Sequence, residues 1–303
     1  MSKFKKVAVL MATYNGEKWI KPQIKSILSQ KNVDVKIIVR DDRSSDDTVK
    51  LINKIKKKNN IQIKINRQNQ RSASLNFLKL ILNANEKYDF YAFSDQDDIW
   101  EQNKLFRAIK KIEQNKCEAY SSNISITKNK QKILMNKSDN QKKYDYIFEG
   151  VPGCTIVLTR KSYLMIRKKL IELNENQLRN ISMHDTFIYF FLRSKKIPWY
   201  IDKFSFIDYR QHESNVVGVN YGLGFSKKKL NGVKKRLKII TSGYYRDSIL
   251  HLAKITSINN WVIKSIKRLN FTDRLRLISS IFQFRRSKLD CFFLVLILCI
   301  IKK

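Results

Sequence analysis

Short apolar runs alternate with amphipathic stretches through the first hundred residues of the chain. Runs that are rich in β-branched residues and apolar on both faces predict strands at residues 7–11, 35–40, 61–65 and 90–94. Apolar residues at helical spacing predict helices between them, at residues 19–30, 46–57 and 74–85. Such strands, separated by helices, predict an α/β fold with a mostly parallel sheet that helices cover on both sides.

The alternation continues to about residue 211 and then changes character. We predict a helix at 103–115, strands near 119–126, 155–158 and 204–210, and helices that begin at Lys161 and Asp185. From about Leu223 glycine and proline nearly vanish, and helical periodicity with many basic residues takes over. We therefore predict an α/β domain over residues 1–222 and a basic helical region over residues 223–303.

Polar runs follow three of the predicted strands. They are ATYNG at residues 12–16, DDRSSD at 41–46 and DQDD at 95–98. In open parallel sheets, ligands bind beyond the carboxyl ends of the strands, so these runs are where binding chemistry is expected.

The acidic run at 95–98 has two interpretations. Its carboxylates are hard oxygen ligands of the kind that hold Mg²⁺ or Mn²⁺, and a substrate diphosphate would complete the coordination shell. Alternatively, Asp97 or Asp98 caps the helix that starts near Asn103.

The run at 41–46 also has two interpretations. Asp46 or Asp47 caps the following helix, whereas Asp41 and Asp42 lie at the strand end, where a carboxylate can accept a hydrogen bond from a ribose hydroxyl or a base N–H. Tyr14 either stacks on that base or packs locally.

Charge and cysteine usage narrow the partners only in part. Lys and Arg number 61 against 26 Asp and Glu, a net charge of +35, which favours nucleic acid, acidic lipid or diphosphates as partners. Alternatively, the positive charge reflects the overall composition of the chain, because Lys, Asn and Ile are abundant throughout. The four cysteines lack the paired spacing of a zinc site or a disulfide framework, which indicates a reducing cytoplasm.

The most apolar segment is CFFLVLILCII at residues 291–301. About 20 residues are needed to span a bilayer, so it is too short to cross one alone, and the apolar run at 7–11 is too short for a signal peptide. The segment is either buried or dips into one leaflet. We favour membrane contact because residues 227–303 contain 19 Lys or Arg, three Asp and no Glu.

Taken together, the motifs resemble the family 2 glycosyltransferases of the GT-A fold, a Rossmann-like mixed sheet flanked by helices. ATYNG at 12–16, RDDRSSDDT at 40–48 and SDQDDIW at 94–100 carry the resemblance, which is closest to the bacterial rhamnosyltransferase-like branch. MHDT at 183–186 and YRQHESNVVG at 209–218 extend it. The resemblance covers residues 7–218 and leaves the basic region unmatched.

The resemblance implies a role for each matching position. Nucleotide-sugar binding would fall to Thr13, Tyr14, Asp41, Asp42, Asp95 and Gln96. Mn²⁺ or Mg²⁺ would be held by Asp95, Asp97 and His212. Asp185 would be the general base of an inverting displacement. Gly153, Cys154 and His184 would line the acceptor side.

Two departures from the family pattern matter. Arg71 and Ser72 stand where a glycine is expected in residues 66–77, so the donor-contacting loop is expected to differ. A Gln-x-x-Arg-Trp motif is also missing, which argues against a processive synthase.

The resulting prediction is an inverting, metal-dependent glycosyltransferase in polysaccharide biosynthesis, for capsule or O-antigen. Its donor would be dTDP-rhamnose or a UDP-hexose and its acceptor a lipid-linked glycan, and it would work in the cytoplasm at the anionic inner face of a bacterial membrane. A nucleic-acid-binding protein is disfavoured because the acidic strand ends repel phosphates and no such module is evident. A catalytically inactive scaffold of the same fold is the other alternative.

Overall fold

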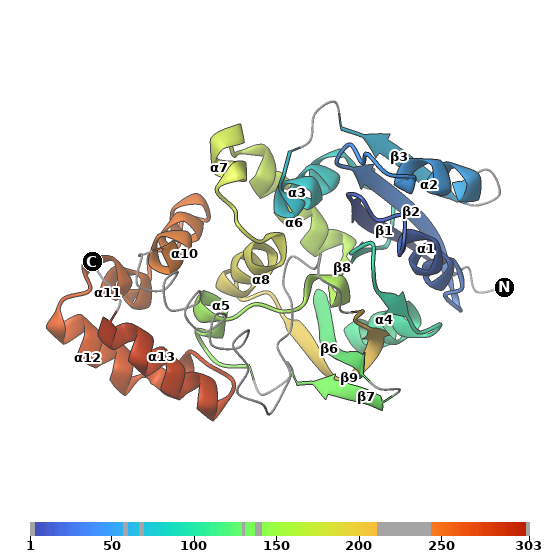
Figure 1. Ribbon diagram of the computed structural model, residues 1–303. Helices are drawn as coiled ribbons and strands as arrows, with labels where there is room; N and C mark the ends of the chain where they lie inside the picture. Colours follow the sequence, from blue (N-terminus) through green and yellow to red (C-terminus); the bar gives the residue numbers. More distant parts are fainter. Residues whose placement is uncertain are drawn as a thin grey trace. The chain divides into compact units, whose positions relative to one another are not determined.

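The computed structural model describes residues 4–56, 60–66, 70–128, 131–136, 141–210 and 244–300 (Figure 1). The chain divides into two compact units. Unit 1 comprises residues 1–138 and 150–210, and unit 2 comprises residues 139–149 and 211–303. The boundary predicted between residues 222 and 223 lies outside the described residues, and the inclusion of 139–149 in unit 2 was not predicted.

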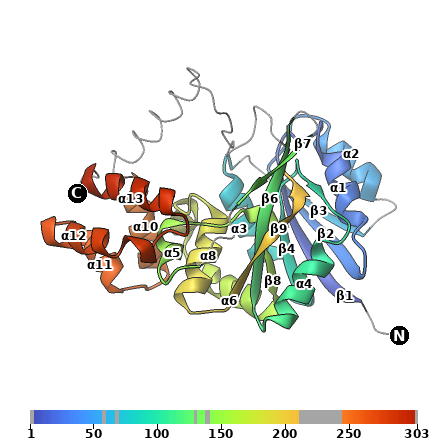
Figure 2. The same cartoon turned by 90° about the horizontal axis from the view of Figure 1, so that it is seen from below.

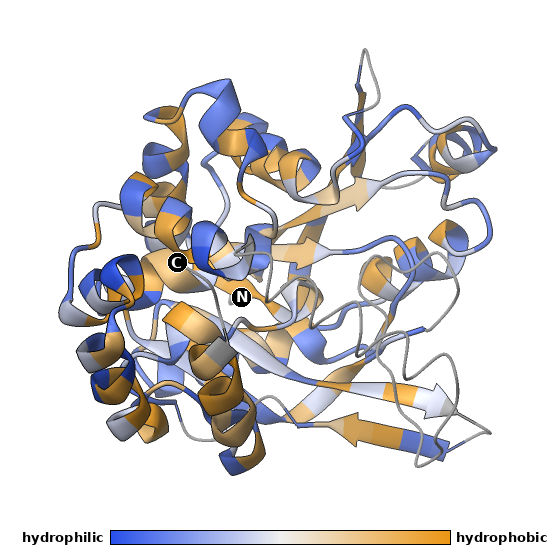
Figure 3. Ribbon diagram, turned by 60° about the vertical axis from the view of Figure 1, so that its left-hand side comes forward, coloured by the Kyte–Doolittle hydropathy of each residue, from blue (hydrophilic) through white to orange (hydrophobic). Residues whose placement is uncertain are grey.

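The first half of unit 1 is the predicted parallel sheet. Its strands are β1 (Lys5–Thr13), β2 (Val33–Asp41), β3 (Ile61–Ile65) and β4 (Phe90–Ser94), in the order β3-β2-β1-β4. The connecting helices are α1 (Ile20–Leu28), α2 (Thr48–Lys56) and α3 (Ala73–Asn83). Val7 to Leu10 of β1 have no exposed surface, because β1 lies between two strands and is covered on both faces. In Figure 3 several strands of the sheet are coloured largely as hydrophobic.

The second half of unit 1 makes the sheet mixed. Its strands are β5 (Ile99–Trp100), β6 (Ala119–Lys128), β7 (Gln131–Met135), β8 (Val157–Thr159) and β9 (Trp199–Asp208). β8 pairs antiparallel with β4 and β6, β7 with β6 and β5 with β9, whereas β6 and β9 are parallel. The sheet as a whole is therefore mixed, as the resemblance to the GT-A fold predicted, and the parallel arrangement predicted from the first hundred residues is confirmed for β1 to β4.

Helices cover both faces of the sheet. The remaining helices of unit 1 are α4 (Lys104–Gln114), α6 (Arg160–Ile171), α7 (Glu175–Arg179) and α8 (His184–Ser194), with a 3₁₀ turn, η1, at Gly153–Thr155. Figure 2 shows α1, α2 and α4 on one side of the sheet and α3, α6 and α8 on the other. In α8 every residue from Phe187 to Leu192 is buried. The helices thus leave the carboxyl edge of β1, β2 and β4 to loops.

Unit 2 is helical. It contains α5 (Asp145–Phe148), α10 (Tyr244–Ile255), α11 (Trp261–Arg268), α12 (Phe271–Ser279), α13 (Lys288–Ile300) and a 3₁₀ turn, η2 (Ile281–Gln283). The buried Arg286 holds α5 to these helices, with Nε 3.0 Å from a carboxylate oxygen of Asp145 and 3.0 Å from one of Glu149. No helix in the described part of the chain is long and apolar enough to cross a membrane. All four cysteines fall in described residues and are unpaired.

Candidate active site

Three strand ends meet at one edge of the sheet. Thr13 pairs with Asp41 in the register of β1 and β2, and Met11 pairs with Ser94 in that of β1 and β4. The polar runs that follow these strands therefore start side by side, as the parallel pattern predicted.

The loops after β1 and β2 interlock through hydrogen bonds. The Asn15 N–H donates to Ser44 Oγ at 2.9 Å, and the Ser45 N–H donates back to Asn15 Oδ1 at 2.8 Å. The Gly16 N–H donates to Thr48 Oγ1 at 2.7 Å. Asn15 adopts a left-handed φ of 46°, which asparagine tolerates better than most residues. The two loops therefore form one surface.

Asp41 is fully buried and braces this surface. Its carboxylate accepts hydrogen bonds from the Thr13 hydroxyl at 2.7 Å, the Ser44 hydroxyl at 2.6 Å and the Ser44 N–H at 2.7 Å. A carboxylate offers about four acceptor sites, so little capacity remains for a ligand. Its predicted contact with the nucleotide stays a prediction, and what the structure shows is a loop-bracing role.

Asp42 does the same for the loop before α3. Its carboxylate accepts hydrogen bonds from Asn66 Nδ2 at 2.7 Å, the Gln70 N–H at 2.8 Å and the Arg71 N–H at 3.1 Å. Arg71 has a left-handed φ of 52°. A glycine is expected at this position, and an arginine in the left-handed region is under backbone strain. The hydrogen bonds to Asp42 offset that strain by fixing the backbone of this turn. In contrast, Tyr14 keeps 47% of its surface exposed.

Gln96 closes the surface from the acidic run. Its side chain binds the Tyr14 backbone on both sides, accepting from the Tyr14 N–H at 2.9 Å and donating to the Tyr14 carbonyl at 2.9 Å. A Cβ at Gly16 would lie 2.3 Å from Gln96 Oε1, so this approach requires glycine at position 16. The predicted contact of Gln96 with the nucleotide sugar stays a prediction, and what the structure shows is that its amide binds the loop that carries Tyr14.

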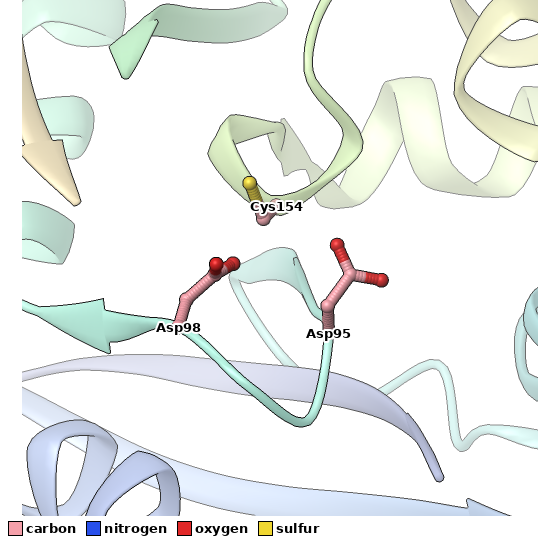
Figure 4. A group of neighbouring side chains, drawn as sticks. All are labelled: Asp95, Asp98 and Cys154. Carbon is pink, nitrogen blue, oxygen red and sulfur yellow. The ribbon is translucent and has the colours of Figure 1, made fainter. Parts of the chain in front are cut away.

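Two carboxylates of the acidic run face the η1 turn (Figure 4). Asp95, Asp98 and Cys154 each place one potential ligand atom within 4.8 Å of the others. Asp98 is fully buried, and neither of its oxygens accepts a hydrogen bond from a nitrogen or oxygen donor among the described residues. Asp95 keeps part of its surface accessible. Apart from the Cys154 thiol, the Asp98 carboxylate has no hydrogen-bond partner among the described residues. A buried carboxylate with so few donors normally needs a cation or a proton, so this pair fits a divalent metal ion.

The pKa values of both groups reflect this crowding. Burial, followed by the negative charges of Asp97 and Asp185, raises the pKa of Asp95 to about 7. Burial and the neighbouring carboxylates Asp95 and Asp97 hold the pKa of Asp98 well above its usual range. Burial also raises the pKa of the Cys154 thiol, so Cys154 is neutral and is poorly suited to be a nucleophile.

The structure groups Asp98 with Asp95, whereas the sequence singled out Asp97. The Asp97 carbonyl accepts a hydrogen bond from Arg210 Nε, and Arg210 Nη2 donates to the Trp19 carbonyl at 3.1 Å. Arg210 thus ties the end of β9 to the acidic run. His212, the third predicted metal ligand, lies outside the described residues, and both it and Asp97 stay predictions.

A buried lysine lies near Asp98 and Cys154. Lys104 is 2% exposed, and its Nζ is 3.5 Å from the centroid of the Trp100 ring. Burial lowers the pKa of Lys104 to about 7, against the raising influence of Cys154 and Asp98. Sequence reasoning missed this residue. Its signal was its position in the apolar stripe of α4, beside Leu105 and one turn before Ala108.

Asp185 lies in the first turn of α8. Its Oδ1 accepts the Thr186 N–H at 2.6 Å, as an acidic residue at a helix start commonly does. Burial raises the pKa of Asp185 to about 6, and backbone hydrogen bonds from Thr186 and Gly153 oppose that rise. The side chain remains partly accessible and is ionised at neutral pH, so it can accept a proton.

The three residues predicted on the acceptor side come together around Asp185. The His184 ring stacks on Phe77 at 3.9 Å between centroids, and burial lowers the pKa of His184 to about 3, so the imidazole is neutral. A Cβ at Gly153 would lie 3.1 Å from His184 Nε2 and 3.3 Å from Asp185 Cβ. Cys154 follows and reaches the carboxylates of the acidic run. The η1 turn therefore bridges the acidic run and Asp185.

The described residues thus place an acidic cluster after β4 and a separate, partly accessible carboxylate, Asp185, at the start of α8. The chain belongs to glycosyl transferase family 2, whose model matches residues 8–198. It is therefore a glycosyltransferase with the GT-A fold, and the resemblance seen in the motifs is confirmed.

Its relatives include the dTDP-rhamnosyl transferase RfbG of Shigella flexneri, which is 36% identical over 295 residues, or 95% of this chain and 98% of the relative. The UDP-Glc:alpha-D-GlcNAc-diphosphoundecaprenol beta-1,3-glucosyltransferase WfaP of Escherichia coli is 35% identical over 122 residues, 40% of this chain and 47% of the relative. TarS 1-349 of S. aureus, solved in complex with UDP-GlcNAc, superposes with a TM-score of 0.55 at 15% identity, and the match covers 92% of this chain and 82% of the TarS 1-349 chain. That likeness shows the fold alone.

Proposed function

We propose that the chain transfers rhamnose from dTDP-rhamnose to a lipid-linked glycan, with inversion at the anomeric carbon and with help from a divalent cation. Similarity to a rhamnosyl transferase over nearly the full length of both chains is the observation that carries the choice of donor. The shorter match to a transferase named for a diphosphoundecaprenol acceptor supports a lipid-linked acceptor. The product would belong to a surface polysaccharide such as capsule or O-antigen.

The donor nucleotide would lie on the surface formed by the loops after β1 and β2. Tyr14 offers a half-exposed ring on which the base can stack. Thr13, Asp41 and Asp42 hold that surface rigid through their internal hydrogen bonds, and Gln96 fixes the backbone of Tyr14. Pre-organised loops bind a ligand at a lower entropic cost than mobile ones.

Asp95 and Asp98 would hold the cation, with Asp97 and His212 as further candidate ligands. Burial of Asp98 without a nitrogen or oxygen donor among the described residues supports this choice. A bound Mn²⁺ or Mg²⁺ would act as a Lewis acid that neutralises the charge on the leaving diphosphate. The Cys154 thiol is a soft ligand that these hard cations do not favour, so its role is to close the site by packing.

Asp185 would take the proton of the attacking acceptor hydroxyl. Its raised pKa of about 6 still leaves it ionised at neutral pH, and partial accessibility lets an acceptor reach it. Attack by the hydroxyl on the face opposite the diphosphate gives inversion in one step, without a covalent enzyme intermediate. Gly153 and His184 would set the position of Asp185 and the width of the acceptor side.

The direct test is sugar transfer by the purified full chain, measured as nucleotide release with a panel of dTDP-, UDP- and GDP-sugars. The panel is run with Mn²⁺, with Mg²⁺ and with chelator. We expect turnover of dTDP-rhamnose that requires the cation, and a product whose anomeric configuration, read by NMR, is inverted.

Asp98→Asn and Asp185→Asn should each lose turnover, whereas the matched control Asp34→Asn should keep it. Asp34 is an exposed residue near the amino end of β2, away from the strand ends that form the site. Turnover of another donor would correct the sugar, and full activity in chelator would remove the cation from the mechanism. If the folded protein turned over none of the donors with a lipid-linked acceptor present, it would be an inactive scaffold.

A further inference from the structure

Helix α13 is apolar on two opposite sides. Cys291, Leu294 and Leu298 point into unit 2 and are between 0% and 4% exposed. A second set of large apolar side chains on the same helix is exposed, at Leu289 (65%), Phe292 (60%), Phe293 (52%) and Leu296 (46%). We call this second set the outer face of α13.

The members of the outer face form one stripe. Leu289, Phe292, Phe293 and Leu296 stand at positions i, i+3, i+4 and i+7, which share one side of a helix. The stripe is about 10 Å long at the helical rise per residue. Isolated exposed apolar residues are ordinary, whereas a continuous stripe of large ones marks a surface that binds something.

The charge around α13 selects the kind of partner. The described residues of unit 2, 141–149 and 244–300, contain twelve Lys or Arg against five Asp or Glu, and Asp145 and Glu149 are paired with Arg285 and Arg286. Asp273 is already paired with Arg268, and Lys288 is exposed in the first turn of α13. A second copy of so basic a unit would be repelled, whereas an anionic surface would be attracted.

We propose that the outer face of α13 docks the protein on the surface of an anionic lipid bilayer, with its two phenylalanines and two leucines among the upper acyl chains and with exposed lysines of unit 2, Lys288 of α13 among them, at the phosphates. Thirteen residues span about 20 Å, less than the roughly 30 Å of a hydrocarbon core, so α13 lies along the interface and does not cross the bilayer. The inference rests on the proposed function only in that a lipid-linked acceptor would be presented at such a surface.

The test is flotation of the full chain with vesicles of phosphatidylcholine alone or with phosphatidylglycerol, at low and high salt. We expect binding to the mixed vesicles, weaker binding at high salt, and little binding to phosphatidylcholine alone. The double variant Phe292→Ser/Phe293→Ser should bind the mixed vesicles on the order of 100-fold less tightly, since it removes two aromatic anchors. The matched control Leu134→Ser/Ile171→Ser removes two exposed apolar residues of unit 1 and should bind as the wild type does.

Three outcomes would overturn the proposal. The first is a wild-type chain that binds no vesicles, and the second is a double variant that binds them as well as the wild type does. The third is a wild-type dimer in ultracentrifugation that dissociates in the double variant without any change in vesicle binding. Circular dichroism and donor turnover in detergent-free solution show that the variants are folded. Those readings also separate the two proposals, because vesicle binding without sugar transfer would refute the proposed function and leave this docking surface in place.

Discussion

Replacing Gly153 by alanine tests whether the η1 turn positions the candidate base. The added methyl carbon would lie 3.1 Å from His184 Nε2, 3.3 Å from His184 Cε1 and 3.3 Å from Asp185 Cβ. Comfortable contacts between carbon atoms are about 3.5–4.0 Å, so something must move by several tenths of an ångström. His184 is held by its stack on Phe77, so Asp185 is the residue that yields.

The size of the effect follows from these contacts. Overpacking of this kind costs about 1–3 kcal/mol of folding free energy. A misplacement of about 1 Å at a catalytic group lowers the rate by about 100-fold, so a smaller shift of Asp185 should lower kcat by on the order of 10-fold to 100-fold. The substitution adds no charge and leaves the residues proposed to hold the cation unchanged, so the affinity for the nucleotide donor should change little.

The assay combines kcat for sugar transfer with the midpoint of thermal unfolding. Gly150→Ala is the matched control, because its methyl would meet one rotatable hydroxyl, Thr186 Oγ1, at 3.1 Å, and its other neighbours lie at 3.9 Å. In the background of His184→Ala, the cost of Gly153→Ala should shrink by about 1 kcal/mol, since the imidazole is the nearest obstacle. A folded Gly153→Ala protein with the wild-type kcat would refute the idea that this turn positions Asp185.

The other predictions concern single sites. Transfer should fall as pH drops through about 6, because burial raises the pKa of Asp185 and a base must be deprotonated to act; a pH–rate profile with no limb there would exclude Asp185 as the base. Gly16→Ala should displace Gln96 from Tyr14 and raise KM for the donor more than it lowers kcat, which steady-state kinetics would show; an unchanged KM would place the nucleotide elsewhere. Arg286→Met should destabilise unit 2 by about 3–5 kcal/mol because Asp145 stays buried without its cation, whereas Lys254→Met, at an exposed lysine of the same unit, should be neutral in urea unfolding.

Residue pattern was enough to predict the first half of the sheet. The runs that became β1 to β4 are short and largely apolar, although β3 alternates apolar and polar residues, and the three helices between them have a regular apolar stripe. Both properties are local, so they do not depend on how the rest of the chain is arranged. The same logic located the polar runs at the strand ends, because the carboxyl ends of neighbouring parallel strands meet at one edge.

The pairing of β8 could not be predicted in this way. β8 has three residues, too few for a periodic signal, and its antiparallel pairing with β4 and β6 joins segments that are far apart in the sequence. The assignment of residues 141–149 to unit 2 also had no local signal. It depends on contacts with residues about 100 to 140 positions further along the chain, such as the ion pair of Asp145 with Arg286 and the hydrogen bond from the Tyr245 hydroxyl to the Phe148 carbonyl.

Sequence by itself determined the family, the order of the strands and helices in the first half of unit 1, and the carboxylates from which a site is built. Tertiary structure alone decided which of these carboxylates are engaged in hydrogen bonds within the protein. Asp41 and Asp42 accept hydrogen bonds from the neighbouring loops, whereas Asp98 is buried without a nitrogen or oxygen donor among the described residues. The physical reason is that periodicity and residue type act over a few neighbouring positions, while burial and hydrogen-bond partners depend on residues that folding brings together from distant segments.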